Sequence, residues 1–322
     1  MNGEFDLIRT YFRSTAKPAS GVLLGVGDDA ALLAPTPGHT LVVATDTLVA
    51  GRHFPADTAA RDIGHKLMAV NLSDMAAMGA RPRWALLALT LPEADADWLA
   101  AFADGLFALA RLHDVSLVGG DTTRGPLTLS LTLLGEVPAG GALRRDAARP
   151  GDWLGVTGTL GDAGLGLALA LGDAALREQV GGQAAFLRER LDRPTPRVAQ
   201  GRALAAHIGQ VHACIDVSDG LAQDLGHVLS QSGVGAEIDV ARLPLSPAVR
   251  EHCVRTGDPS LPLCAGDDYE LLFSFVPEAG DALREVLDFT VIGRVTAEPG
   301  LRLLDEQGKR IDRATPGHDH FR

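Results

Sequence analysis

The fold prediction for this chain starts from one stretch, Val70-Asn71-Leu72-Ser73-Asp74-Met75-Ala76-Ala77-Met78-Gly79-Ala80. Apolar residues recur at spacings of three and four from Ile63 to Met78, which predicts a helix that ends at Gly79. Asp74 and its polar neighbours interrupt the apolar face. A carboxylate among Ala and Met is costly to bury unless a cation or hydrogen-bond donors meet it. Asp74 is therefore either a solvated residue on the outer face or a ligand.

Aspartates recur beside Gly, Ser or Thr at the ends of other apolar runs. These turns are Gly27-Asp28-Asp29, Thr45-Asp46-Thr47, Gly119-Gly120-Asp121-Thr122-Thr123, Asp216-Val217-Ser218-Asp219-Gly220 and Gly266-Asp267-Asp268. One such turn is ordinary, because Gly-Asp is a common turn dipeptide. Together with Asp74, the set indicates carboxylates gathered at one rim of a sheet to hold hard cations such as magnesium.

Composition narrows the class of protein. The chain has 322 residues, enough for about two domains, and it is 46% hydrophobic and 22% charged, as expected of a globular protein. The net charge of −12 argues against a nucleic-acid partner, since non-specific binding needs a basic face. An acidic protein can still bind phosphates through metal ions. The three cysteines have no CxxC spacing, which argues against a disulfide framework or a zinc site.

The sequence predicts a cytoplasmic protein with no membrane partner. The first residues lack a basic segment followed by an apolar one, so no signal peptide is expected. The richest apolar run, 165–171, is too short to span a bilayer.

Strands and helices alternate along the chain, which predicts an α/β or α+β fold. We expect strands at 22–26, 41–44, 84–91, 115–118, 127–134, 153–156, 214–215, 236–240, 270–275 and 290–295, and helices at 4–16, 98–112, 161–171, 200–207 and 221–230. The Gly-, Pro- and Arg-rich stretch 138–150 has no apolar period and predicts a boundary between a domain over 1–138 and another over 150–322.

Familiar catalytic signatures are missing. The chain has no GxxxxGK[ST] loop and no HRD or DFG set, and Gly161 to Gly166 only roughly resembles a dinucleotide fingerprint. Ser218 is not in a GxSxG elbow, so no residue is predicted as a catalytic nucleophile. His53 is a lone loop histidine, and Arg144-Arg145 suits either a solvated linker or a phosphate clamp. A phosphoryl-transfer enzyme of this kind would rely on a metal-rich aspartate site.

The aspartate motifs, in their order along nearly the whole chain, resemble the thiamine-monophosphate kinase family. The matching stretches are 25–33, 45–51, 70–80, 119–125 and 216–220. The resemblance implies the two-domain fold of the aminoimidazole-ribotide synthetase superfamily, with N-terminal sheets closing into a barrel in a homodimer and a C-terminal α/β domain. It implies transfer of the ATP γ-phosphate to thiamine monophosphate, the last step of thiamine diphosphate biosynthesis, with several magnesium ions as cofactors.

Site residues follow from the resemblance position by position. It implies metal binding at Asp28, Asp29, Thr45, Asp46, Asp74, Asp121, Asp216 and Asp219. It implies ATP contacts at Gly120, Asp121, Arg145 and Ser218, and substrate contacts at His53, Asp267 and Phe321. The family often has Gly-Glu-Asp-Tyr-Glu where this chain has Gly266-Asp267-Asp268-Tyr269-Glu270, so Asp267 is one methylene shorter and its contact is expected to be weaker or water-bridged.

Rival functions make different demands on the sequence. Selenophosphate synthetases carry a reactive cysteine or selenocysteine near the N-terminus, and none of Cys214, Cys253 and Cys264 lies there. Hydrogenase-maturation members of the superfamily end in a cysteine-bearing tail, whereas this chain ends in Asp-His-Phe-Arg. A catalytically silent metal or nucleotide sensor would keep the aspartates and show no turnover.

Overall fold

The structure is a computed structural model that describes residues 8–12 and 20–311. Its contacts divide the chain at Gly140 into an N-terminal and a C-terminal unit, and the short segment Ala76–Gly79 groups with the C-terminal one. Each unit has its own main sheet with helices packed against it. Within the described ranges, no helix is both long and apolar enough to cross a membrane.

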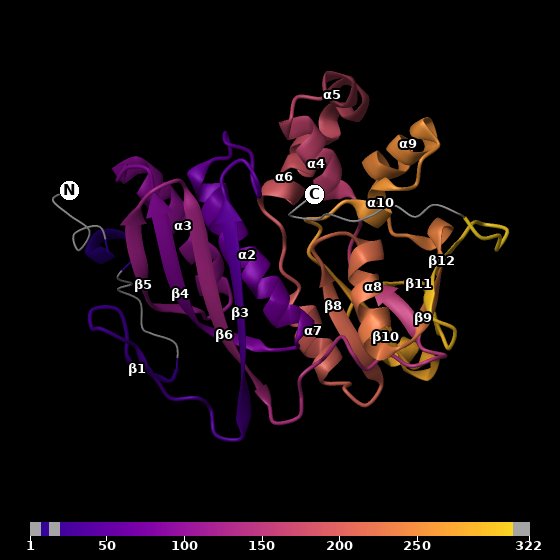
Figure 1. The fold of residues 1–322 in the computed structure, drawn as a ribbon, viewed down its shortest axis with the longest axis horizontal. Coiled ribbons are helices and arrows are strands. Elements are labelled where there is room, and N and C mark those ends of the chain that lie inside the picture. Colours follow the sequence, from indigo (N-terminus) through magenta and orange to yellow (C-terminus); the bar gives the residue numbers. More distant parts are fainter. Residues whose placement is uncertain (1–7, 13–19, 312–322) are drawn as a thin grey trace. The chain divides into compact units, whose positions relative to one another are not determined.

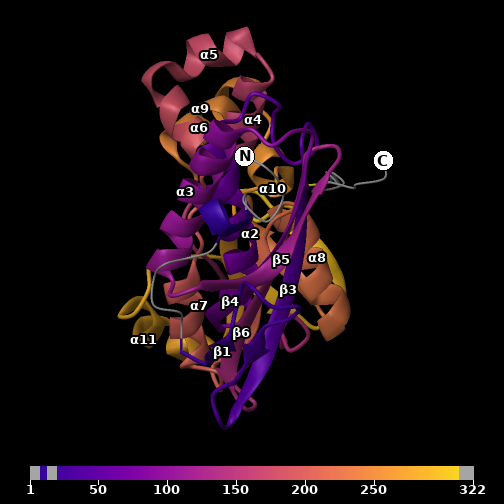
Figure 2. The ribbon, with the colours of Figure 1, turned by 90° about the vertical axis from the view of Figure 1, so that its left-hand side faces the viewer.

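The N-terminal unit is built on a four-stranded sheet in the order β3-β6-β4-β5. β4 and β5 are parallel, and the other two pairs are antiparallel. The strands are β3 (His39–Val49), β4 (Arg81–Leu91), β5 (Ser116–Arg124) and β6 (Thr128–Pro138). Helices α2 (Ala60–Ala77) and α3 (Ala96–Leu112) cover one face of this sheet and leave the other face open (Figures 1 and 2). A small hairpin, β1 (Val22–Leu24) and β2 (Leu32–Leu33), and one π-helical turn, η1 (Ile8–Phe12), precede it.

Alternation in β6 explains why one face of this sheet is covered. Leu129, Leu131 and Leu133 are fully buried, while the hydroxyl residues between them are half-buried. The strand expected at 127–134 is therefore confirmed, and it continues to Pro138. The stripe of α2 is also buried, and its end at Ala77 and the left-handed Gly79 (φ +67°) agree with the prediction.

Strand β3 is longer than its sequence suggested. We expected it to end at Thr45-Asp46, but pairing with β6 continues without a break to Val49. The hydroxyl of Thr45 bonds to that of Thr132, and Thr47 bonds to Ser130 in the same way at 2.7 Å. These cross-strand hydroxyl pairs continue the pairing of β3 with β6 through a stretch whose sequence, taken alone, resembles a turn. Asp46 therefore lies inside a strand, as do Asp121 in β5 and Asp216 in β8 (Val211–Val217).

The C-terminal unit contains a six-stranded sheet in the order β12-β9-β11-β7-β10-β8. Its remaining strands are β7 (Trp153–Val156), β9 (Gly235–Asp239), β10 (Glu270–Phe275), β11 (Thr290–Thr296) and β12 (Gly300–Leu304). Helix α8 (Leu221–Ser232) buries Leu221, Leu225 and Val228 in the main core of this unit. β7 and β10 have the predicted bounds, while β12, which pairs in parallel with β9, was not predicted.

A second cluster of helices in this unit has its own small core. Its members are α4 (Asp162–Ala170), α5 (Ala174–Val180), α6 (Ala184–Asp192) and α9 (Pro247–Thr256). The shorter elements are α7 (Val198–Ala205), α10 (Leu261–Cys264), α11 (Gly280–Arg284), η2 (Gly181–Gln183), η3 (Val240–Arg242) and η4 (Pro277–Ala279). Sequence reasoning missed α9, although Ser246 caps the N–H of Val249 and Pro247 occupies the first turn, which is a usual helix start.

Candidate functional site

A cavity of about 510 Å³ lies in the N-terminal unit beside edge strand β5. Asp28, Asp29 and Asp121 line it together with Gly120, so four predicted site residues meet around one space. Apolar side chains complete the wall, among them Leu86 and Val118. A volume of this order, with an apolar wall and a few convergent polar groups, is typical of a small-ligand site.

Gly120 is the position where the backbone itself shapes this cavity. Its φ is +152°, and an added Cβ would lie 1.9 Å from the carbonyl oxygen of Leu87 on the neighbouring strand. No other residue type fits without moving β4 or β5. Gly120 is also exposed, and its contact with ATP stays a prediction.

Asp46 lies at the opposite edge of the same sheet. It pairs with Leu131, which pairs with Leu87, which pairs with Gly120. At about 4.8 Å per strand, Asp46 is about 14 Å from the β5 edge, too far for one ion to bind both within one chain. The expectation of one common rim therefore does not hold for Asp46 and Asp121, because β6 and β4 insert between their strands.

Thr45 and Asp46 point to different faces of the sheet. The Thr45 hydroxyl lies with that of Thr132 on the open face. Alternation places Asp46 with the buried Leu48 on the helix-covered face. Asp74 is half-buried on α2, which covers that same face. The imidazole Nδ1 of His53 accepts the N–H of Val49 at 3.0 Å, just after the end of β3.

The donor set around the cavity fits magnesium, which binds carboxylate oxygens and usually keeps water and substrate phosphate as its other ligands. Asp28, Asp29 and Asp121 supply such oxygens. Asp28 already accepts the N–H of Asp29 at 2.8 Å. Within residues 8–12 and 20–311, no three His, Cys, Asp or Glu side chains converge closely enough to form a complete protein-only ion site.

In the C-terminal unit, the end of β8 carries the other group of predicted residues. Asp216 is buried within the strand, while Ser218 and Asp219 follow it half-exposed. The side-chain amide of Gln223 donates to Asp219 at 3.0 Å. Arg145 is exposed on the segment before β7, and its neighbour Arg144 donates to Asp146 at 2.8 Å.

Asp224 is a residue of this site that sequence reasoning missed. One of its carboxylate oxygens accepts three consecutive backbone N–H groups, those of Ser218, Asp219 and Gly220, at 3.0, 3.1 and 3.1 Å. Burial, followed by the charge of Asp216, raises the pKa of Asp224 to about 7. The side chain fixes the main-chain path of the loop after β8. Its position in the first turn of α8, four residues after Gly220, was the available signal.

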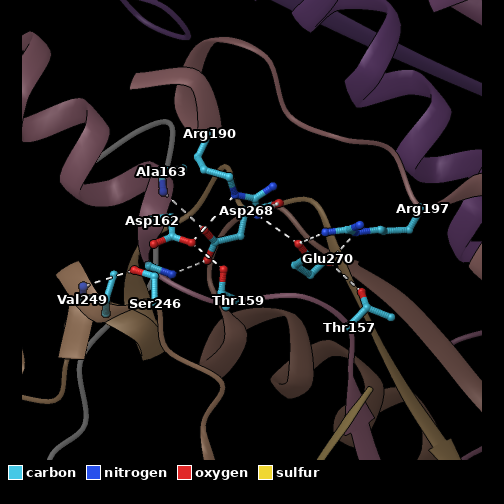
Figure 3. A network of polar contacts seen from close by, with 11 residues as sticks. Thr157, Thr159, Asp162, Ala163, Arg190, Arg197, Ser246, Val249, Asp268 and Glu270 are labelled. Carbon is cyan, nitrogen blue, oxygen red and sulfur yellow. Dashed lines mark hydrogen bonds and ion pairs between the residues drawn. The ribbon is translucent and has the colours of Figure 1, made fainter. Parts of the chain in front are cut away.

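A buried polar network includes Asp268 (Figure 3), the residue that follows the predicted substrate residue Asp267 in the sequence. Asp162, Asp268 and Glu270 are at most 1% exposed, and Arg190 and Arg197 meet them. Arg197 binds Glu270 through two hydrogen bonds of 2.6 Å each. Burial raises the pKa of Asp268 to about 8, although the N–H of Gly161 and the charge of Arg190 oppose the shift. Phe321, the third predicted substrate contact, lies outside the described residues.

Two family models match the chain. The model of the AIR synthase related protein N-terminal domain matches residues 27–137, and that of the C-terminal domain matches residues 149–306. The thiamine-monophosphate kinase of Salmonella typhimurium strain LT2 is 46% identical over 99% of this chain and 98% of its own length.

Solved structures of thiamine-monophosphate kinases are also similar to this chain. The crystal structure of thiamine-monophosphate kinase from Stenotrophomonas maltophilia K279a is 49% identical, with a TM-score of 0.82, and the match covers 91% of this chain and 93% of that one. A structure described as AaThiL complexed with AMPPCP and TMP is 32% identical, with a TM-score of 0.76, and the match covers 98% of this chain and 96% of that one.

Proposed function

We infer the function from sequence similarity, because the chain belongs to the thiamine-monophosphate kinase family of AIR synthase related proteins. We propose that it transfers the γ-phosphate of ATP to thiamine monophosphate. The observation that carries the proposal is the end-to-end similarity to named kinases. A related structure was obtained with AMPPCP and TMP together, which fits an ATP-dependent reaction on that acceptor. The products are thiamine diphosphate and ADP.

The transfer is direct in this proposal. A phosphate oxygen of thiamine monophosphate forms a bond to the γ-phosphorus as the bond between that phosphorus and the bridging oxygen of ADP breaks. The acceptor is ionised near neutral pH, so it needs little help from a general base, and the motifs supply no nucleophile. Labelled ATP incubated with the enzyme alone should leave no covalent phosphoprotein; a labelled protein formed as fast as turnover would contradict the direct route.

The nucleotide end of the site lies at the cavity beside β5. Gly120 offers an exposed main chain, and the carboxylates of Asp28, Asp29 and Asp121 would hold magnesium. Bound there, the ion would neutralise charge on phosphate oxygens and align two polyanions that otherwise repel. We assign Asp46, Asp74, Asp216, Asp219 and Thr45 to further metal contacts, and Arg145 and Ser218 to ATP.

The substrate end requires groups for a cationic ring and an aminopyrimidine. A carboxylate suits both the charge and the amine, and Asp267 is half-buried at a fixed turn. His53 lies in the loop after β3, where its Nδ1 accepts the N–H of Val49. We assign these two side chains, with Phe321, to thiamine monophosphate.

We also propose that the enzyme is a homodimer in which the open faces of the N-terminal sheets meet. Val43 on β3 is 59% exposed and Leu86 on β4 is 38% exposed on that face, where Thr45 also lies. β3 and β5 are edge strands, and a second copy would pair or cover them. Light scattering should give about twice the chain mass of 33.7 kDa at micromolar concentration, and a monomer mass would refute the dimer.

The assay that tests the function measures ADP release with ATP and magnesium, with and without thiamine monophosphate. ADP release should depend on both thiamine monophosphate and magnesium, and thiamine diphosphate should appear in equal amount. Binding of ATP without acceptor-dependent ADP release would identify a silent nucleotide sensor instead.

A further inference from the structure

The turn that carries Asp267 has an unusual backbone. Asp267 has a φ of +66° and Tyr269 a φ of +51°, and among the described non-glycine residues only Asp114 shares this left-handed conformation. The conformation is unfavourable for residues with a Cβ, and two of them flank Asp268 within three positions. Such strain persists only where the surroundings hold it, and it concentrates at functional sites.

The end of β8 holds the turn from one side. The N–H of Asp267 donates to the carbonyl oxygen of Ser218, and that of Tyr269 donates to the carbonyl oxygen of Val217, both at 2.8 Å. Gly266 packs so closely that an added Cβ would lie 2.3 Å from the Ser218 oxygen. Two backbone hydrogen bonds and one close packing contact therefore fix the position of the turn against the loop that carries the predicted ATP and metal contacts.

Asp268 holds the turn from the other side, because its side chain points into the buried network (Figure 3). Its carboxylate accepts the N–H of Gly161 at 2.7 Å, before the start of α4. Arg190 donates to the backbone oxygen of Asp268 at 3.3 Å and to Glu270 at 2.9 Å. With Asp268 only 1% exposed, these contacts fix the middle of the turn.

The consequence is a carboxylate that is oriented before a ligand arrives. The hydroxyl of Tyr269 donates to one carboxylate oxygen of Asp267 at 3.0 Å. A carboxylate has about four acceptor positions, so it can bind more than one donor at the same time. Holding the side chain in one orientation reduces the rotamer entropy that binding would otherwise cost.

We propose that Tyr269 and Asp268 are positioning residues that set the carboxylate of Asp267 for the amine-bearing, cationic end of thiamine monophosphate. The proposal rests on the proposed function. Tyr269 acts on the carboxylate through its hydroxyl, and Asp268 acts on the turn through Gly161 and the arginine of α6.

The first test is a double-mutant cycle on the full-length enzyme, with ADP release as the readout. Tyr269→Phe should raise the KM for thiamine monophosphate three- to tenfold and leave kcat and the KM for ATP within twofold. Asp267→Asn should raise the same KM at least tenfold. If Tyr269 acts through Asp267, the double variant should be no worse than Asp267→Asn. A KM at the wild-type value in Tyr269→Phe, or effects that multiply in the double variant, would overturn the proposal.

The matched control is Ser274→Ala on the same unit. Ser274 is a fully buried β10 residue whose hydroxyl donates to the buried Asp152 at 2.9 Å, away from the turn. It should lower the melting temperature and leave both KM values within twofold. A rise in the KM for thiamine monophosphate equal to that of Tyr269→Phe would show that any weakening of the unit has this effect, and would overturn the assignment.

Asp268 is tested by rescue. Asp268→Ala should raise the KM for thiamine monophosphate at least fivefold, while Asp268→Asn, which keeps an acceptor for Gly161, should restore it to within twofold. Equal KM values in both variants would remove Asp268 from the proposal, and the Tyr269 cycle tests the turn if Asp268→Ala does not fold. Failure of the proposed function would show differently, as wild-type enzyme that releases no ADP when thiamine monophosphate is added.

Discussion

Replacing Asp224 by Ala should cost about 3 kcal/mol of unfolding free energy. The change removes the common acceptor of three backbone N–H groups. Gly220 is buried, so its N–H loses a partner that water cannot replace, at about 1–3 kcal/mol. Ser218 and Asp219 are half-exposed, so each loses only a net hydrogen bond of about 0.5–1.5 kcal/mol. Asp224→Asn keeps an acceptor oxygen in place and should cost less than about 1 kcal/mol.

Urea unfolding followed by circular dichroism measures the difference between the two variants. Hydrogen exchange in the peptide that spans 211–225 measures the local effect, which should be faster amide exchange at 218–220 in Asp224→Ala alone. The kcat of that variant should fall at least tenfold, because the loop carries Ser218 and Asp219. Alanine and asparagine variants of equal stability and equal exchange would refute the idea that the carboxylate holds the loop.

Three further changes have effects that the structure determines. Asp74→Asn should lower kcat about 100-fold and should not lower the melting temperature. A loss of this order is expected when one preorganised electrostatic contact of roughly 3 kcal/mol is removed. A variant with more than a tenth of wild-type activity would show that Asp74 is not a ligand of the proposed metal site. Asp267→Gly should be more stable to urea than Asp267→Ala by about 1 kcal/mol, because only glycine relieves the left-handed backbone, while both variants lose affinity for thiamine monophosphate; equal stabilities would show that the turn is not strained. Since the pKa of Asp268 is raised to about 8 from 3.8, the folded enzyme binds a proton that the unfolded chain has lost, and its unfolding free energy falls as pH rises from about 4 to 8. Asp268→Asn removes this slope, so its stability relative to wild type should be higher at pH 8 than at pH 5, and an unchanged difference would contradict the shift.

The local sequence pattern was sufficient to predict the bounds of some strands. β7 and β10 have their predicted bounds, because each is a short, almost continuously buried run. β3 was predicted too short, since Thr45-Asp46 resembles a turn until the hydroxyl pairs with β6 are known. β12 was missed because its parallel pairing with β9 is a tertiary choice that leaves no periodic signal in five residues.

The site shows the same division between local and tertiary information. The aspartate motifs brought Asp28, Asp29 and Asp121 to one cavity, as the sequence indicated. The separation of Asp46 from Asp121 depends on strand order, which the motifs do not encode. Gly266-Asp267-Asp268 lies in the segment between α10 and β10, and its sequence does not say which carboxylate points inward.

That choice follows from what each position of the turn must provide. Gly266 is glycine because the Ser218 carbonyl leaves no room for a Cβ. Asp267 shares the left-handed backbone that favours glycine, yet a glycine there would offer no carboxylate, so the strain remains and must be offset nearby. The offset comes from hydrogen bonds with fixed directions, from Gly161 and Arg190, rather than from apolar packing. Directional contacts specify an orientation where apolar ones specify mainly volume, and a carboxylate that must meet a ligand needs the orientation.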